Sequence, residues 1–384
     1  MAAARLGGEQ EGLGHGPALA VNVLGKVHAA FTAPDGRIHY ARWTGSAWTP
    51  EEILPSPAAQ NYFQHVAAAP NGKPHVVMTS KLGADSNSYA ILYTTRQAKA
   101  WTEPIQLSTE PGAQVPCIAI GADNVRHVVY YSLQSGKIHY TRNDGSGWSA
   151  PQAIANGLRP EIVVDGNGVV HLVWMRSRTP YGVMYARRDS GGNWSTPINV
   201  ARAGEQQIPT VAVDATGRVS MVWYRGAVGT NTLSFAQIAP DGVITRQTNV
   251  QGNFAFAHWP RIAVDCMNRV RIVYQAKAAA NKPWRVYQRV FDGAKWSGPA
   301  RLDGPEQTPE CQVPDIGAKG TTLAVGWYSS GSKECFADVT LLECSAPVSM
   351  TRAGKRGAVK RQPRRERSPQ RSVKRKTSAK NKKG

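Results

Sequence analysis

The stretch Pro160-Glu-Ile-Val-Val-Asp165, followed by Gly168 and by Val170-His-Leu-Val-Trp174, is one copy of a block that occurs seven times. All seven copies align with one another without a gap. They begin at Pro17, Gln64, Pro116, Pro160, Pro209, Pro260 and Pro314, so successive starts are 47, 52, 44, 49, 51 and 54 residues apart. A period of about 40–50 residues that contains several strand-like runs is typical of a β-propeller with one blade per repeat.

Each complete repeat contains four runs that we expect to be strands. The first is apolar on both faces, as in Arg261-Ile-Ala-Val-Asp265, which suits a strand covered on both sides. A turn with Gly or Asn leads to the second run, and the third resembles Ile38-His-Tyr-Ala-Arg42. The fourth opens with Trp-Ser-x-Pro or a near match. Because β-branched and aromatic residues dominate all four runs, the sequence predicts an all-β chain of four-stranded blades.

The seventh repeat lacks its fourth strand, and the start of the chain offers a replacement. Ala4-Arg-Leu-Gly-Gly-Glu-Gln10 resembles Ala300-Arg-Leu-Asp-Gly-Pro-Glu-Gln307, which is the fourth strand of repeat six and its exit. We therefore expect residues 4–7 to complete blade seven, so that no blade keeps an open edge. The predicted organisation is a seven-bladed propeller over residues 1–345 and a disordered Lys/Arg-rich tail over residues 346–384.

Composition adds expectations about compartment and chemistry. The chain contains no apolar run of about 18 residues, so we expect no transmembrane segment. Its start lacks the apolar centre of a secretion signal, which favours an intracellular location, cytoplasmic or nucleic-acid associated. For the five cysteines we expect reduced thiols, with a Cys335–Cys344 bridge as the alternative. Their spacing matches no zinc motif, and we expect neither a metal nor a cofactor.

Most of the positive charge lies in the tail. Residues 351–384 hold 15 Lys or Arg and one acid, against a net charge of +20 for the whole chain. Such a segment is expected to attract phosphate by counterion release, so we predict contact with nucleic acid or another polyanion. A solubilising role, nuclear import and contact with an anionic membrane are the alternatives. The residues that we expect to bind the polyanion are Arg361, Arg364, Arg365, Arg367, Lys374, Arg375 and Lys376.

For residues that recur at the same repeat position, we favour a structural role over a role in binding. Four histidines share one position (His28, His75, His127 and His171) and are expected to form hydrogen bonds between strands or blades. The recurrent Tyr-x-Arg pairs are expected to pack between blades, with similar pockets for an acidic or sugar ligand as the alternative. We interpret the recurrent Trp of the fourth strand as a packing anchor, and the recurrent Asp of the first turn as a turn cap.

Aromatic residues that break the repeat are the better binding candidates, because the repeat does not explain them. We predict no catalytic residue. The candidate ligand-binding residues are Trp43, Tyr62, Tyr181, His258, Trp259 and Trp284.

The repeat resembles the sialidase-like, Asp-box (BNR) class of propellers. Asp189-Ser-Gly-Gly-Asn-Trp194 matches the Asp-x-Gly-x-x-Trp part of the Asp-box, and Asp144-Gly-Ser-Gly-Trp148 is one residue shorter. The resemblance implies a propeller fold that serves in enzymes, lectins and scaffolds. The chain lacks the Arg-Ile-Pro motif of sialidases, and we read its arginines as following the repeat. It resembles seven-bladed bacterial lectins in architecture, and in those lectins sugars are held between blades.

Three functions are therefore open. The first is a non-enzymatic binding or scaffold propeller that recognises a glycan or protein at a rim, with a cationic tail contacting a polyanion. The second is a sialidase-like glycoside hydrolase. The third is a structural subunit of a nucleoprotein or particle assembly. Arg and carboxylate groups that converge in the central funnel would favour the enzyme.

Overall fold

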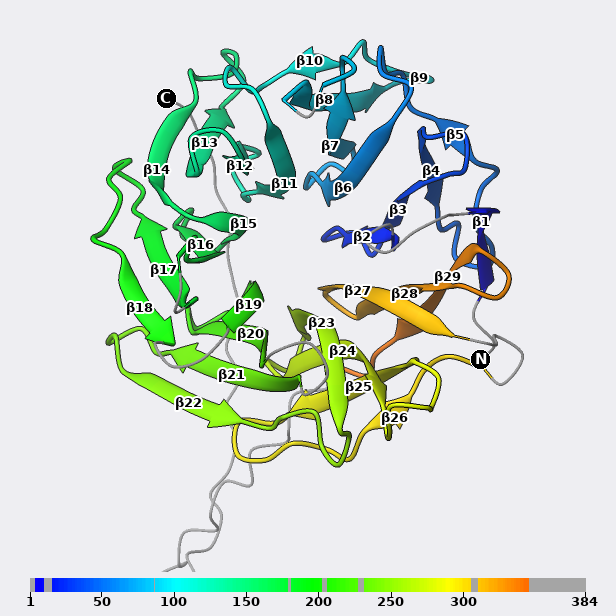
Figure 1. The fold of residues 1–384 in the computed structure, drawn as a ribbon, viewed down its shortest axis with the longest axis vertical. Helices are drawn as coiled ribbons and strands as arrows, with labels where there is room; N and C mark the ends of the chain where they lie inside the picture. Colours follow the sequence, from blue (N-terminus) through cyan, green and yellow to red (C-terminus); the bar gives the residue numbers. More distant parts are fainter. Residues whose placement is uncertain are drawn as a thin grey trace, which may run out of the picture. The chain divides into compact units, whose positions relative to one another are not determined.

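The computed structural model describes residues 4–9, 16–85, 87–178, 181–201, 206–226, 231–304 and 310–344. These residues form 29 strands, grouped into seven sheets that surround a common centre (Figure 1). They contain no helix that is long and apolar enough to cross a membrane. The chain divides into two units, Met1–Ser345 and Ala346–Gly384, and all described residues belong to the first unit. The predicted seven-bladed propeller is confirmed.

The first four blades each follow the chain from an inner strand to an outer one. Blade one comprises β2 (Ala18–Val21), β3 (Val27–Thr32), β4 (Ile38–Arg42) and β5 (Glu52–Ile53). Blade two comprises β6 (Asn61–Ala68), β7 (Pro74–Lys81), β8 (Tyr89–Gln97), β9 (Ala100–Trp101) and β10 (Ile105–Gln106). Blade three comprises β11 (Ala113–Ile120), β12 (Arg126–Ser132), β13 (Lys137–Asn143) and β14 (Gln152–Asn156). Blade four comprises β15 (Leu158–Val164), β16 (Val170–Met175), β17 (Val183–Arg188) and β18 (Ile198–Ala201).

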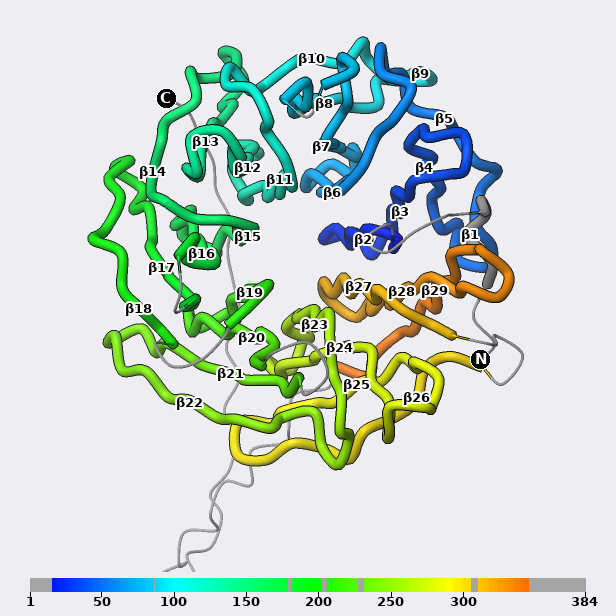
Figure 2. The backbone as a smooth tube through the Cα atoms, viewed as in Figure 1, coloured from blue at the N-terminus to red at the C-terminus, as the bar shows by residue number. Residues whose placement is uncertain are grey.

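Blades five and six repeat this pattern. Blade five comprises β19 (Gln206–Val213), β20 (Val219–Arg225), β21 (Thr232–Ile238) and β22 (Ile244–Thr248). Blade six comprises β23 (Phe256–Val264), β24 (Val270–Lys277), β25 (Arg285–Phe291) and β26 (Ala300–Arg301). The smooth trace in Figure 2 shows the seven inner strands (β2, β6, β11, β15, β19, β23 and, from blade seven, β27) gathered at the centre of the ring.

Blade seven takes strands from both ends of the propeller. Its order is β1-β29-β28-β27, where β27 is Cys311–Lys319, β28 is Thr322–Ser329 and β29 is Glu334–Leu341. The outer strand β1 (Ala4–Glu9) pairs antiparallel with β29, and Ala4 lies opposite Ala337. This confirms the predicted closure by the N-terminal strand, which extends to Glu9, two residues beyond the predicted limit of residue 7.

Neighbouring blades pack through aromatic pairs. The fourth-strand Trp of one blade meets the third-strand ring of the preceding blade edge-on. Centroid distances are 5.0 Å for Tyr40–Trp101, 4.8 Å for Tyr93–Trp148, 5.2 Å for Tyr140–Trp194 and 5.1 Å for Phe235–Trp296. Edge-to-face rings at this spacing attract one another beyond the area they bury. The predicted role of this Trp as a packing anchor is confirmed.

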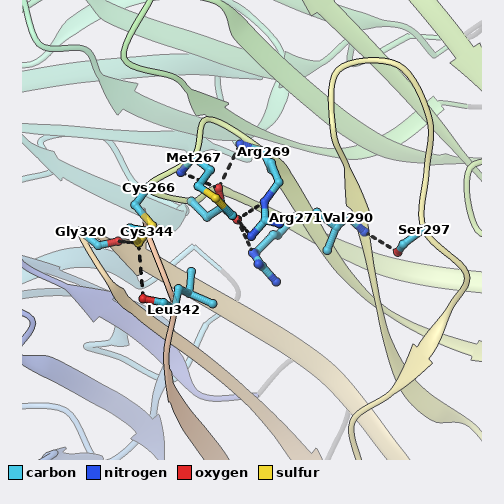
Figure 3. Close-up of polar contacts among 10 residues, drawn as sticks. Cys266, Met267, Arg269, Arg271, Val290, Ser297, Gly320, Leu342 and Cys344 are labelled. Carbon is cyan, nitrogen blue, oxygen red and sulfur yellow. Dashed lines mark hydrogen bonds and ion pairs between the residues drawn. A yellow bond between two sulfur atoms is a disulfide. The ribbon is translucent and has the colours of Figure 1, made fainter. Parts of the chain in front are cut away.

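A disulfide ties the end of the propeller to blade six. Cys344, which follows β29, is bonded to Cys266 in the turn between β23 and β24, with their Cα atoms 5.8 Å apart (Figure 3). Cys117, Cys311 and Cys335 lie outside this bond and are buried. The expectation of reduced thiols is therefore wrong for Cys266 and Cys344. The alternative, a Cys335–Cys344 bridge, is also wrong, because Cys344 pairs with Cys266. Cys335 lies in β29, inside blade seven, whereas Cys344 lies beyond the blade and reaches the neighbouring turn.

Candidate functional site

The inner strands line a central channel. Each inner strand after blade one is interrupted by a bulge at the start of its repeat. The side chains one position beyond that start differ in every blade: Ala18, His65, Cys117, Glu161, Thr210, Arg261 and Asp315. All of these except Thr210 border one cavity of about 90 Å³ at the centre of the ring. We call the end of the channel where the inner strands begin the mouth, and the opposite end of the propeller the far face.

An arginine with two carboxylates forms the polar part of the channel. Arg261 lies 2.7 Å from Glu161 and 3.6 Å from Asp315, and these residues come from blades six, four and seven. Each carboxylate also accepts a backbone N–H from the next blade, from Val211 for Glu161 (3.2 Å) and from Leu19 for Asp315 (2.7 Å). The channel side chains therefore join blades as well as facing the cavity.

Burial sets the protonation of these groups. Burial raises the pKa of Glu161 to about 7, although Arg261 opposes the shift, and it also raises the pKa of Asp315. Burial lowers the pKa of His65 to about 3 and raises that of the Cys117 thiol. Cys117 Sγ and His65 Nε2 are 3.6 Å apart. Both groups are neutral at pH 7, so this pair lacks the thiolate that a cysteine nucleophile needs.

A collar of six residues surrounds the mouth. Each directly precedes a repeat start and has a φ between 47° and 50°, in the left-handed region: Phe63, Val115, Arg159, Ile208, Trp259 and Val313. All six border the cavity. Bulky residues in this conformation cost about 1–3 kcal/mol each, and such residues cluster at binding sites and active sites. Five of the six side chains are apolar and one is cationic.

Arg159 and Trp259 face each other within the collar. The guanidinium carbon of Arg159 lies 5.8 Å from the centroid of the Trp259 ring, although blade five separates their two blades. Within the described part of the chain, no carboxylate lies within ion-pair distance of Arg159. The collar therefore combines an aromatic surface with a cation that no described acid neutralises.

A second kind of cavity lies between blades, at the far face. One, of about 320 Å³, lies between blades one and two and is bordered by His28, Tyr40, Arg42, Lys73 and Arg96, among others. Another, of about 270 Å³, lies between blades four and five and is bordered by His171, Tyr185 and Arg187 at the same repeat positions. The repeat thus places one His–Tyr–Arg set in two equivalent pockets. Similar pockets were the alternative interpretation of the recurrent Tyr-x-Arg pairs.

The histidines of these pockets are held rigidly. His28 Nδ1 lies 2.7 Å from the Tyr40 hydroxyl, and His171 Nδ1 lies 2.8 Å from the Tyr185 hydroxyl. His75 and His127 make the same bond to Tyr93 and Tyr140, which confirms the predicted hydrogen-bonding role. Burial, with smaller contributions from Arg42 and Lys26, lowers the pKa of His28 to about 4. The imidazole is therefore neutral at pH 7, and its buried Nε2 has no hydrogen-bond partner among the described residues.

Charge distinguishes the two pockets. In the pocket between blades one and two, Glu52 pairs with Arg96 at 2.8 Å, whereas no described carboxylate pairs with Arg42 or Lys73. The pocket between blades four and five has Arg187 but also Asp241 and the apolar side chains Ile198 and Ile238. The first pocket therefore suits an anionic group, and the second suits a neutral one.

The structure divides the candidates predicted from the sequence between the two ends of the propeller. Trp43 follows β4 at the far face and packs on Trp48 at 5.5 Å. Four others lie at the mouth end on or next to strand starts: Tyr62, His258, Trp259 and Trp284. Tyr181, in the loop before β17, lies at that end as well. The polyanion-binding residues proposed for the tail lie outside the described residues.

Two of these candidates form one cluster. His258 lies 4.8 Å from Trp284 and 5.3 Å from Tyr224, and Lys277 Nζ lies 4.8 Å from the Trp284 ring. Burial and the Lys277 charge lower the pKa of His258 to about 4. Tyr62 instead pairs with Tyr89, at 6.3 Å.

The residues that sequence reasoning missed are those of the channel. Arg261 and Arg159 depart from the repeat, which corrects the reading that the arginines follow it. The signal was present in the alignment of the seven copies, because the position after each start carries a different residue in every blade. Strong variation inside an otherwise regular block marks side chains that the repeat does not explain.

No family model and no curated protein matches the sequence. Solved structures share its fold. A polysaccharide lyase (ulvan lyase) bound to a saccharide that contains GlcA is 10% identical, with a TM-score of 0.62, over 89% of this chain and 95% of the lyase. An α-L-arabinofuranosidase from Fusarium graminearum is 10% identical, with a TM-score of 0.53, over 89% and 98%. A Hadza microbial sialidase is 9% identical, with a TM-score of 0.51, over 83% and 74%. At these identities the likeness is one of fold, and these neighbours are enzymes that act on glycans.

Proposed function

We propose that this chain is a glycan-binding propeller whose blade-interface pockets take sugar residues, with an acidic sugar in the pocket between blades one and two. The observation that carries the proposal is the recurrence of one His–Tyr–Arg set in two cavities at equivalent positions. Volumes of about 320 and 270 Å³ suit a single sugar unit. Hydroxyl and imidazole groups that are already fixed by a mutual bond lose little freedom when a ligand binds.

The charge of the first pocket supports the acidic ligand. Arg42 and Lys73 present two cations without a described acidic partner, and a carboxylate or sulfate would pair with them. Such charge-assisted hydrogen bonds are about twice as strong as neutral ones. The glycan-acting neighbours are consistent with a carbohydrate ligand. Their likeness to this chain is one of fold, which carries no catalytic residue over to it, so we propose binding without cleavage.

A glycan array with acidic and neutral oligosaccharides tests the proposal. We expect acidic glycans to bind, and Arg42→Gln together with Lys73→Gln to weaken the best of them about tenfold or more. Arg225→Gln with Lys295→Gln is the matched control, because it removes the same charges from exposed positions outside the blade-interface pockets. Binding that the Arg42/Lys73 pair does not affect, or an array without any acidic hit, would refute it.

Glycan cleavage is the second candidate, and Glu161 is the observation that favours it. A carboxyl whose pKa lies near 7 can donate a proton at neutral pH, and Asp315 shares its arginine partner. Against this candidate, both carboxylates already bond to Arg261 and to backbone N–H groups. Reducing-end assays on acidic polysaccharides, with Glu161→Gln for comparison, test it. Activity that survives in the Glu161→Gln variant would exclude this mechanism.

For the tail we propose contact with nucleic acid or another polyanion. The basic residues of 351–384 motivate this proposal, and their lack of aromatic partners favours binding without sequence readout. We expect the full chain to bind heparin and RNA in low salt and to release both as salt rises. A protein that ends at residue 350 should lose this binding. Unchanged retention by the shortened protein would contradict the assignment.

A further inference from the structure

We propose that the channel mouth is a separate binding site, which takes one ring-bearing carboxylate, with Arg159 holding the carboxylate and Trp259 the ring. The site is distinct from the blade-interface pockets, since its residues come from the inner strands and lie at the opposite end of the propeller. It also stands independently of the function proposed for those pockets.

Departure from the repeat points to Arg159. At the collar position three blades carry Val or Ile and one carries Phe, so the collar requires only an apolar side chain for packing. An arginine there adds a charge that packing does not need, in a conformation that a bulky side chain adopts at a cost. The described residues place no carboxylate beside it, and a ligand carboxylate would fill that role with paired hydrogen bonds.

The walls of the cavity determine what accompanies the carboxylate. Trp259 borders the cavity with the Arg159 guanidinium over its ring at 5.8 Å, so an aromatic surface lies beside the cation. Phe63, Val115, Ile208 and Val313 complete an apolar ring around the cavity. A flat or chair-shaped ring with apolar faces packs against such a surface. The cavity volume of about 90 Å³ is less than a whole ring acid needs, since a cavity of about 150 Å³ holds a benzene. The ring therefore enters only in part and the rest of the ligand lies in the collar, so the site takes a terminal ring or a small molecule.

The floor of the channel determines which side of the ligand points inward. Glu161 and Asp315 have oxygens that accept hydrogen bonds, and Arg261 occupies only part of their capacity. An inward-facing carboxylate would meet these two acids, whereas inward-facing hydroxyls would donate to them. The ligand is therefore oriented with its carboxylate at the collar and its opposite edge toward the floor.

Titration calorimetry with two carboxylates tests the site and distinguishes the sources of the ring. Glucuronate represents an acidic sugar, and cyclohexanecarboxylate represents an apolar ring acid. The titrations use the full chain that carries Arg42→Gln and Lys73→Gln, so that the blade-interface pocket does not contribute. We expect saturable binding of at least one acid, and of glucuronate in preference, because its hydroxyls can donate to Glu161 and Asp315.

Two further substitutions in that background locate the binding. Arg159→Gln should weaken it about tenfold or more, and Trp259→Val should weaken it as well. Trp259→Val introduces the residue that blades three and seven carry at this position, so the fold is expected to accept it, and a melting temperature within a few degrees checks this. Arg178→Gln, an exposed arginine in the loop after β16, is the matched control and should leave the affinity unchanged.

The outcomes separate this proposal from the function proposed for the pockets. Loss of binding with Arg159→Gln supports the channel site whichever acid binds and whatever the Arg42/Lys73 pair does to glycan binding. If neither acid binds, or if both bind the Arg159→Gln and Trp259→Val variants as tightly as their parent, the channel site is refuted while the pockets stay untouched.

Discussion

Single side chains around the channel connect blades and set the electrostatics of the centre. Glu161 and Asp315 accept N–H groups from neighbouring blades and share Arg261. Buried charges are tolerated only when they are paired and hydrogen-bonded, which explains why an arginine occupies blade six between two acids. The repeat predicted a hydrogen-bonding role for the recurrent histidines, and the structure supplies the partner, as in the bond between His28 and Tyr40. The alignment of the copies marks the positions of this triad by their variation, but it does not predict which of them pair, because its members come from three blades.

The raised pKa of Glu161 predicts how the stability of the fold depends on pH. Because burial raises its pKa from the ordinary 4.5 to about 7, the unfolded chain ionises first as the pH rises. The stabilisation from the protonated carboxyl is therefore present below pH 4.5 and is lost between about pH 4.5 and 7. Each pH unit of difference between the folded and unfolded pKa values corresponds to about 1.4 kcal/mol of unfolding free energy. We expect the unfolding free energy of the wild type, relative to Glu161→Gln, to fall between about pH 4.5 and pH 7 in urea titrations.

The matched control for this experiment is Glu103→Gln, which removes a carboxylate from an exposed position. A difference between wild type and Glu161→Gln that is flat across this pH range would show that the Glu161 carboxyl titrates as an exposed acid does.

At the scale of strands, one contact repeats around much of the ring. A third-strand Tyr or Phe receives the edge of the fourth-strand Trp of the next blade. In the pair of Tyr40 and Trp101, the indole N–H also donates to Glu52 at 2.9 Å. The recurrence of Trp predicted an anchor correctly. Its partner could not be predicted, because that ring belongs to another blade and sequence spacing does not report distances between sheets.

A double-mutant cycle tests this inter-blade contact. Trp101→Ala and Tyr40→Leu should each destabilise the fold, by about 2–4 kcal/mol for the tryptophan. Their interaction energy should be about 0.5–1.5 kcal/mol, which is typical of an aromatic pair. The control cycle combines Trp101→Ala with Tyr185→Leu, the equivalent tyrosine in blade four, and should be additive within about 0.5 kcal/mol. Additivity in both cycles would show that the two blades are not coupled through these rings.

At the scale of the whole propeller, the ring is closed at two places. Strand β1 completes blade seven at its outer edge, and the Cys266–Cys344 bond ties the end of the same blade to blade six. Asp265, next to the disulfide, accepts two backbone N–H groups and pairs with Arg269 and Arg271 at 2.8 and 2.9 Å. Its capping of the turn confirms the predicted role of this recurrent Asp, and it gives the disulfide a rigid anchor.

Removing the disulfide should destabilise the propeller. Cys266 and Cys344 are 78 residues apart, and a loop of that length corresponds to about 4 kcal/mol of chain entropy. We expect Cys266→Ser with Cys344→Ser, or reduction of the wild type, to lower the denaturation midpoint accordingly. Cys335→Ser is a control that removes a buried cysteine outside this bond. Equal midpoints for the oxidised and reduced wild type would contradict the expectation.

The redox state of this bond in the natural protein bears on location as well. Disulfides persist in oxidising compartments and are rare in the cytosol. Mass spectrometry of peptides that contain Cys266 and Cys344, from protein isolated under alkylating conditions, therefore tests the expected intracellular location directly. Alkylated free thiols at both positions are the result expected for a cytosolic protein.

The sequence by itself determined the number of blades, the four-strand plan of the repeat, the closing strand and the structural roles of the recurrent His, Trp and Asp. All of these are local or periodic, and a repeat reports periodic interactions because each copy restates them. Only the tertiary structure decided which residues meet across the ring: Arg261 with Glu161 and Asp315, Arg159 with Trp259, and Cys266 with Cys344. These contacts join residues 50 to 100 positions apart, where the angle and spacing between blades, which no single repeat specifies, decide which atoms come together.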